Sequence, residues 1–145
     1  MSFRIRSIDN DHESVQKAVL GSLIAFNDAK VGESGYRPIA FAIEDDRGQM
    51  IGGLSGATAY GWLFIELLFV PEPLRGQGVG TELLRRAEAA AVARGCHSVW
   101  LDTFEFQARG FYERLGYTCF GELKNYPTAS RFFMSKQLRR SRELA

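Results

Sequence analysis

Apolar residues recur along the chain with two different spacings, which separate the expected strands from the expected helices. Alternation over Phe3–Ile8 predicts a half-buried strand. A spacing near helical period, from Val15 to Phe26, predicts a helix over Glu13–Asn27. The next segment, Asp28–Pro38, is polar and contains glycines, and it predicts a loop of the kind that often carries a binding site.

Three strands in close succession are expected next. They cover Ile39–Glu44, Met50–Tyr60 and Trp62–Val70, and short glycine-containing turns separate them. Strands joined by short turns run in opposite directions, so this part should be an antiparallel meander. The third strand is apolar on both faces except at Glu66, a pattern typical of a central strand that is covered on both sides.

The second half of the chain alternates helices and strands. The expected elements are a helix over Gly78–Arg94, a strand over His97–Thr103, a helix over Gln107–Leu115, and strands over Tyr117–Leu123 and Arg131–Ser135. Gly95 and Gly116 follow the two helices directly, where glycine commonly ends a helix. A strand, helix and strand joined in this way lie parallel in a sheet, so the strand from His97 should run parallel to the third strand of the meander.

Together these elements predict an α/β fold in which the helices pack on one mixed sheet of about seven strands. The order along the chain is strand, helix, three strands, helix, strand, helix, two strands. The 145 residues are the usual size of one domain, and neither a linker nor an internal repeat divides them. We therefore expect a single domain over residues 1–145.

Composition and charge narrow the function. The formal net charge of +1 argues against a protein that binds nucleic acid through a strongly basic surface. No stretch approaches the roughly 20 apolar residues of a membrane span, and the charged start of the chain lacks the apolar core of a signal peptide. Cys96 and Cys119 lack metal-ligand spacing and predict reduced thiols. We expect a cytoplasmic protein without a metal and without nucleic-acid or membrane partners.

A glycine-rich segment, Arg75-Gly76-Gln77-Gly78-Val79-Gly80-Thr81, lies between an apolar strand and the start of a helix. The first amides of a helix have no partners within it, and the helix dipole adds partial positive charge there. Glycines let an anion approach the backbone closely, and Arg75 adds a full positive charge. The segment therefore predicts a phosphate-binding site.

Two common nucleotide-binding motifs do not fit this segment. A P-loop needs Lys followed by Ser or Thr after the last glycine, whereas Thr81-Glu82 stands there. A Rossmann fingerprint needs three glycines directly after a strand, but Leu83 replaces the third and Pro71–Leu74 separates the glycines from the strand. The antiparallel meander before the segment also disagrees with a doubly wound sheet.

Two segments resemble signatures of the GNAT superfamily of N-acetyltransferases. Val70–Gly80 is similar to the acetyl-CoA motif Gln/Arg-x-x-Gly-x-Gly/Ala, and Gln107–Tyr117 is similar to an aromatic-Tyr-x-x-x-Gly-aromatic run after the fifth strand. The two signatures have the usual separation, and the inferred order of elements matches over nearly the whole chain. The run Thr103–Ala108 resembles a subgroup labelled general or antibiotic-type acetyltransferases.

The resemblance implies a sheet that splays between its fourth and fifth strands, with acetyl-CoA in the cleft. The pyrophosphate would bind the glycine-rich segment, and the pantetheine arm would pair with the free edge of the strand before it. The implied cofactor residues are Leu68, Phe69, Val70, Arg75, Gly76, Gln77, Gly78, Val79, Gly80, Thr81, Gln107 and Tyr112. Many family members have an Asn near the pantetheine where this chain has Glu105, which leaves the contacts around Gln107 open.

Two residues are expected to carry the chemistry. Glu66 is the lone charge in its strand, and burial would raise the pKa of its carboxyl and make it a general base. The alternative is a carboxylate that pairs with an arginine or only positions the substrate. The resemblance implies that Tyr112 lies near the CoA sulfur and protonates the leaving thiolate. Tyr112 also belongs to an apolar helical stripe, so a purely structural role is its alternative.

The resulting hypothesis is an enzyme that moves the acetyl group of acetyl-CoA to the primary amine of a small molecule, by direct attack in a ternary complex. Two other readings remain. One is acetylation of a protein N-terminus or lysine, and the other is a catalytically silent module that binds acyl-CoA. The identity of the acceptor and the formation of a homodimer stay open at this point.

Overall fold

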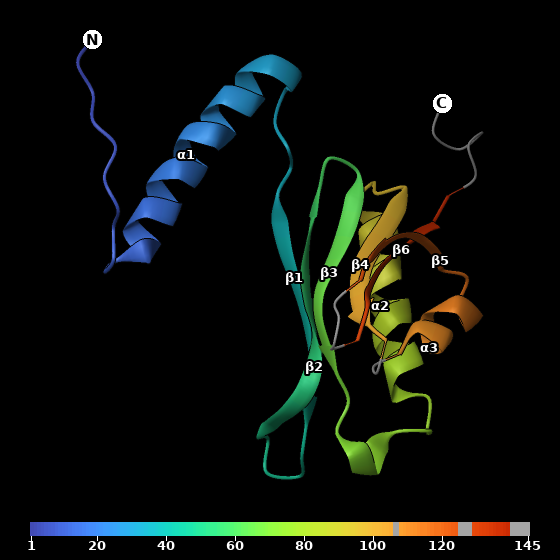
Figure 1. The fold of residues 1–145 in the computed structure, drawn as a ribbon. Helices are drawn as coiled ribbons and strands as arrows, with labels where there is room; N and C mark the ends of the chain where they lie inside the picture. The colour runs from blue at the N-terminus through green and yellow to red at the C-terminus, as the bar shows by residue number, and fades with distance from the viewer. Residues whose placement is uncertain (106–107, 125–128, 140–145) are drawn as a thin grey trace. The chain divides into compact units, whose positions relative to one another are not determined.

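The computed structural model describes residues 1–105, 108–124 and 129–139. It divides the chain into two compact units, Met1–Ser34 and Gly35–Ala145. Figure 1 shows a single helix in the first unit and a twisted sheet with two α-helices in the second. The expectation of one domain over residues 1–145 stays a prediction.

The first unit is built around helix α1 (His12–Val31). The carboxylate of Asp11 accepts a hydrogen bond from the N–H of Ser14 at 3.3 Å, which is the usual arrangement of an N-cap. The helix ends at Gly32, whose φ of 85° is easily adopted only by glycine. It therefore runs beyond the expected end at Asn27, because the first residue that stops a helix comes only at Gly32.

Residues 3–8 form neither a helix nor a strand, so the expected first strand is wrong. Alternation specifies which side chains could share a face, but it does not supply a neighbour for the backbone. A strand forms only where its N–H and C=O groups find partners. In the part of the chain that the structure describes, the sheet accordingly has six strands instead of about seven.

The sheet of the second unit has the order β1-β2-β3-β4-β6-β5. Its strands are β1 (Arg37–Glu44), β2 (Met50–Ala59), β3 (Trp62–Phe69), β4 (Ser98–Phe104), β5 (Thr118–Leu123) and β6 (Arg131–Gln137). β1, β2 and β3 form an antiparallel meander, and β4 lies parallel to β3. β6 pairs antiparallel with both β4 and β5. The predicted meander and the predicted parallel crossover are thus confirmed.

Helices α2 (Val79–Ala93) and α3 (Arg109–Arg114) pack on one face of this sheet (Figure 1). Alternate residues of the central strands meet one side of α2 there, in a core that includes Leu63, Ile65, Val99, Leu101, Met134, Leu83, Leu84, Ala87 and Ala91. Burying each leucine contributes about 1.5–3 kcal/mol. Because Leu63 and Ile65 point toward the helices, Trp62 and Phe64 point to the opposite face.

That opposite face is rich in aromatic side chains. Phe64 stacks on Trp100, with ring centroids 4.2 Å apart. Within this unit, Trp62 is 37% exposed and Phe69 is 56% exposed. β3 is central in the sheet, as predicted, but the expectation that both of its faces are buried is wrong for this unit. Apolar residues on both faces of a strand indicate that both faces are suited to burial. They do not indicate which element covers each face.

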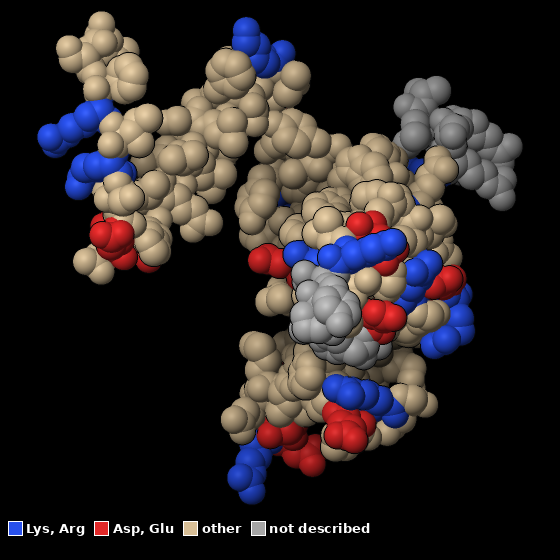
Figure 2. All heavy atoms as spheres, viewed as in Figure 1, with Lys and Arg blue, Asp and Glu red and all other residues tan. Residues whose placement is uncertain are grey.

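Charged side chains of both signs are interspersed over the surface of the second unit. Figure 2 shows Lys and Arg beside Asp and Glu on the visible face, without a large patch of one sign. Ion pairs such as Arg86–Glu82 and Arg109–Glu113, both at 2.8 Å, account for part of this mixture. Among the described residues, no helix combines the length and apolar character needed to cross a membrane.

Candidate active site

The glycine-rich segment connects the end of β3 to α2. A short 3-10 turn, η1 (Glu72–Leu74), follows β3, and Arg75 leaves it in an extended conformation. Gly76 and Gly78 have φ values of 76° and 83°, which favour glycine at both positions. Gly78 is the N-cap of α2, and no side chain caps this end. The amides over residues 78–81 therefore have no partner within the helix and can bind an anion.

Arg75 folds back on the end of β3. Its Nε donates a hydrogen bond to the carbonyl oxygen of Val70 at 2.9 Å, and its Cζ lies 5.8 Å from the ring centroid of Phe69. The side-chain amide of Gln77 donates to the carbonyl of Pro73 at 2.9 Å. These contacts hold the loop against the end of the strand and keep the guanidinium of Arg75 over the ring of Phe69.

The start of α2 also lies against α3. A Cβ at Gly80 would lie 3.2 Å from Cζ of Phe111, so a glycine permits this close approach. Phe111 contacts Tyr112 edge to face, with 5.2 Å between the ring centroids. One aromatic ring therefore links the glycine-rich segment to the tyrosine of the second signature.

The pairing of β3 with β4 covers only part of each strand. The register pairs end at Ile65–Leu101, whereas β3 continues to Phe69 and β4 continues to Phe104. On its other side, β4 stays paired with β6 as far as Phe104. Beyond Ile65, β3 no longer pairs with β4 along the edge that faces it. The wider splay expected between these strands stays a prediction.

Glu66 follows the last of these pairs and lies at a β-bulge. β2 pairs Gly56 with Ile65 and Ser55 with Leu67, so Glu66 is the extra residue of β3. Its side chain is exposed, and the expected burial of this carboxylate is therefore wrong. The reason is the one given for the two faces of β3, because one face of this strand is open within this unit. The role of Glu66 as the base stays a prediction.

Tyr112 is buried, with 6% of its surface exposed. Its ring meets Phe111 and Tyr117 edge to face, at 5.2 and 5.7 Å between centroids. Burial, assisted by the charge of Asp102, raises the pKa of Tyr112 to about 12. The phenol is protonated at neutral pH with or without this shift, so the shift does not distinguish the two roles. Tyr112 has the packing that the structural alternative requires, and its role as the acid stays a prediction.

The other expected cofactor residues divide into three groups. Leu68 and Val70 are partly buried against the core, whereas Phe69 is exposed. The loop residues from Arg75 to Thr81 lie together at the start of α2, as the sequence predicts. Gln107 lies outside the described residues.

An ion pair on the aromatic face of the sheet was not predicted from the sequence. Nε of Arg131 donates to Oδ1 of Asp102 at 2.9 Å. Cζ of Arg131 also lies 5.3 Å from the ring centroid of Phe133 and 6.0 Å from that of Phe104. Alternation in β4 could have placed Asp102 on the face that lacks helices, but its partner depends on the register between β4 and β6.

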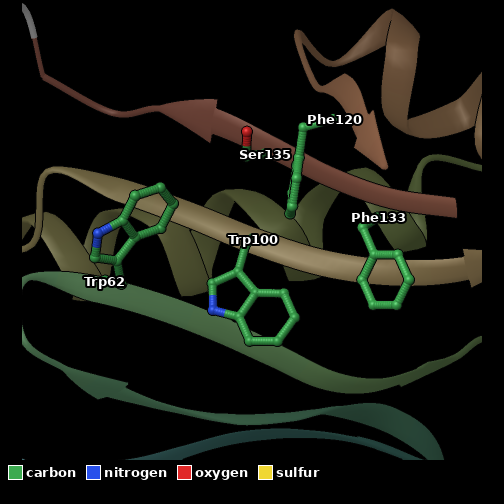
Figure 3. Close-up of a pocket in the computed structure, with 5 residues that line it drawn as sticks. All are labelled: Trp62, Trp100, Phe120, Phe133 and Ser135. Atoms are coloured by element: carbon green, nitrogen blue, oxygen red, sulfur yellow. The ribbon is translucent and has the colours of Figure 1, made fainter. Parts of the chain in front are cut away.

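A shallow aromatic cavity of about 480 Å³ lies on the same face (Figure 3). It is lined by Trp62, Trp100, Phe120, Phe133 and Ser135, which come from β3, β4, β5 and β6. Figure 3 shows these side chains on the side of the sheet away from α2. Phe133 is shared with the ion pair, so the cavity and the charged pair are continuous along the sheet.

Comparison with known proteins identifies relatives of the chain. Residues 7–117 match the model of the Acetyltransferase (GNAT) family. The chain is 45% identical over 108 residues to acetyltransferase Atu2258 of Agrobacterium fabrum, covering 74% of this chain and 79% of that protein. It is 42% identical over 83 residues to blasticidin-S acetyltransferase of Streptomyces morookaense, covering 57% of this chain and 61% of that protein.

Solved structures share the fold. The crystal structure of a protein assigned as an acetyltransferase, from Agrobacterium tumefaciens, superposes with a TM-score of 0.84 and 38% identity, covering 94% of this chain and 99% of that one. An aminoglycoside 6′-N-acetyltransferase in complex with coenzyme A superposes with a TM-score of 0.61 over 94% of this chain and 98% of that one. At 19% identity, this second likeness concerns the fold alone.

Proposed function

The chain belongs to the GNAT family of acetyltransferases, and from this premise we propose that it transfers the acetyl group of acetyl-CoA to the primary amine of a small molecule. The amine attacks the thioester directly in a ternary complex. The family uses acyl-CoA as its donor. The direct attack, the small-molecule acceptor and the roles of individual residues are the proposed parts.

The observation that carries the proposal is the uncapped start of α2 beside the end of β3. Gly78 opens the helix without a side-chain cap, and Arg75, three residues before it, donates a hydrogen bond to the carbonyl oxygen of Val70. A pyrophosphate would accept hydrogen bonds from the amides of Gln77, Gly78, Val79, Gly80 and Thr81. Arg75 would supply a full positive charge, and the φ of Gly76 turns the loop toward the helix.

We place the pantetheine arm along the edge of β3 beyond Ile65. The pairing with β4 ends there, so the backbone groups of Leu68, Phe69 and Val70 are suited to pair with the amides of the arm as an added strand would. This route leads from the start of α2 toward Glu66 and Tyr112.

The chemistry needs a proton to leave the amine and a proton to reach the sulfur. The amine nitrogen bonds to the thioester carbonyl carbon, and Glu66 takes the amine proton directly or through water. The carbonyl oxygen becomes an oxyanion, for which a backbone N–H near Phe69 or Val70 is the proposed donor. The C–S bond then breaks, and the sulfur takes the proton of the Tyr112 hydroxyl.

A small-molecule acceptor is favoured over a protein by one relative. Blasticidin-S acetyltransferase, by its name, acts on a small molecule, and it is 42% identical to this chain over the matched part. The open aromatic cavity of about 480 Å³ has the size of a small-molecule site. Both observations support a compact acceptor and do not identify it.

The test is release of CoA from acetyl-CoA with a panel of small amines and of peptides with a free N-terminus or lysine. The proposal expects turnover with small amines at a kcat/KM at least about tenfold above that of the peptides. Preference for the peptides would favour the protein acetyltransferase. Binding of acetyl-CoA without turnover of any acceptor would favour the silent module.

A further inference from the structure

Arg131 has a fixed position on the face of the sheet opposite α2. Its Nε donates to Oδ1 of Asp102 at 2.9 Å. Its guanidinium carbon lies 5.3 Å from the ring centroid of Phe133 and 6.0 Å from that of Phe104. A carboxylate and two rings thus restrict a side chain that otherwise has large rotamer freedom, so part of the entropy cost of binding a ligand is already met.

Arg131 is the outer member of this pair. Its side chain is 40% exposed, whereas that of Asp102 is 21% exposed. The contact with Asp102 uses Nε, and the guanidinium carries two further nitrogens. Their planar fork matches the two oxygens of a carboxylate or phosphate, which a lysine ammonium cannot match in the same way. An arginine oriented from behind by an acid is therefore suited to bind an anion from the solvent side.

The pair lies near the proposed chemistry. Asp102 follows Leu101, the last residue of β4 that pairs with β3, just as Glu66 follows Ile65. The charge of Asp102 also acts on Tyr112, whose pKa it helps to raise. An acceptor that approaches the thioester from the aromatic face would therefore pass beside this pair.

We infer that Arg131, positioned by Asp102, determines acceptor specificity by binding an anionic group that the acceptor carries in addition to its attacking amine. The anionic group is a carboxylate or a phosphate. The inference rests on the proposed function and names the acceptor class. The simpler alternative is a brace between strands, because Asp102 pairs with Phe133 and is thus a diagonal neighbour of Arg131.

The test uses acceptors in matched pairs that differ in one charge. Amino acids are paired with their carboxamides, and phosphoethanolamine is paired with ethanolamine, so the two kinds of anion are separated. CoA release gives kcat and KM for the wild type and for Arg131→Gln, Asp102→Asn and Arg86→Gln. Arg86 is the matched control because it also forms an ion pair through Nε, with Glu82 at 2.8 Å, on the exposed surface of α2.

We expect the wild type to favour the anionic member of a pair by about tenfold or more, mainly through KM. Arg131→Gln should reduce this preference to about twofold or less, while kcat for the neutral members changes little. Asp102→Asn keeps the charge of Arg131 but removes the carboxylate that positions it, and it should give an intermediate preference. Arg86→Gln should leave the preference unchanged. Should Arg131→Gln fail to fold, Arg131→Lys replaces it and should lower the preference in part.

Three results would overturn the inference. The first is an equal change of KM for both members of each pair in Arg131→Gln, which is what a simple brace predicts. The second is a wild type that favours the neutral members. The third is the absence of any anionic acceptor among the substrates of a protein that binds acetyl-CoA. Titration with acetyl-CoA separates these cases from failure of the proposed function, since a wild type that does not bind acetyl-CoA overturns both.

Discussion

Ile65 of β3 and Leu101 of β4 are the last residues that these two parallel strands pair, although both strands continue. Glu66 and Asp102 follow them directly, so a candidate base and an ion-paired acid stand at the same level of the sheet. The end of a strand ladder leaves backbone groups available to a ligand.

Glu66→Gln should lower kcat/KM by about 10²-fold or more, because loss of a general base removes this much of the rate. The rate is measured as CoA release with acetyl-CoA in excess. Glu72→Gln is the control, since Glu72 is a nearby exposed carboxylate in η1. A mutant that keeps most of the rate would show that water or another group takes the proton.

Tyr112→Phe should lower kcat by about 10²-fold while the affinity for acetyl-CoA and the Tm change little, because the ring remains and only the proton donor is lost. Tyr117→Phe is the matched control. Tyr117 is also buried, and its hydroxyl donates to Glu88 at 2.9 Å. This second change should cost about 1 kcal/mol of stability and leave kcat near that of the wild type. Unchanged kcat in Tyr112→Phe would mean that Tyr112 is simply part of the core.

Stability should decline in alkaline solution. Burial and the charge of Asp102 raise the pKa of Tyr112 to about 12, and burial and Glu88 raise the pKa of Tyr117. In the unfolded chain both phenols titrate near pH 10. The unfolded state therefore loses these protons first, and the free energy of unfolding falls between about pH 10 and 12. Urea unfolding across this range measures the slope. If Tyr112→Phe leaves the slope as steep as in the wild type, this assignment is wrong.

Gly52→Ala should lower acetyl-CoA affinity by about tenfold, since pre-organised backbone partners are lost when their position shifts. A Cβ at Gly52 would lie 2.6 Å from the carbonyl oxygen of Phe69 and 2.9 Å from Cδ of Pro71, so the end of β3 must move. Gly21→Ala is the control, because a Cβ there meets nothing within 4 Å. Calorimetric titration measures both affinities. Equal affinities in a folded Gly52→Ala protein would remove the β3 edge from the cofactor site.

The sequence predicted the second unit better than the first. The spacing of apolar residues and the turn residues are enough to predict the meander, the parallel crossover and both α-helices of the second unit. Each of these depends on local pattern and on general rules for connecting strands and helices. The strand predicted over Phe3–Ile8 is wrong, since a strand needs a hydrogen-bonded neighbour that its own pattern does not specify. The predicted burial of Glu66 is wrong for a related reason. Apolar residues on both faces of β3 do not reveal which element covers each face.

The candidate site was predictable only where a motif fixes the backbone. Gly76 and Gly78 have the left-handed φ values that glycines in such a loop suggest. The contact between Asp102 and Arg131 spans 29 positions along the chain and depends on the register of two strands. No single-sequence pattern specifies such a register, and so this ion pair became visible only in the folded structure.

Binding of acetyl-CoA at the start of α2 is tested most directly by titrating Gly78→Glu and Gly95→Glu with acetyl-CoA. The two glycines flank opposite ends of α2, have φ values of 83° and 91°, and would each place a Cβ in open space. Both changes should therefore cost similar stability, about 1 kcal/mol. Only Gly78→Glu should abolish acetyl-CoA binding, because it puts a negative charge at the proposed pyrophosphate site. Wild-type affinity in a folded Gly78→Glu protein would contradict this assignment.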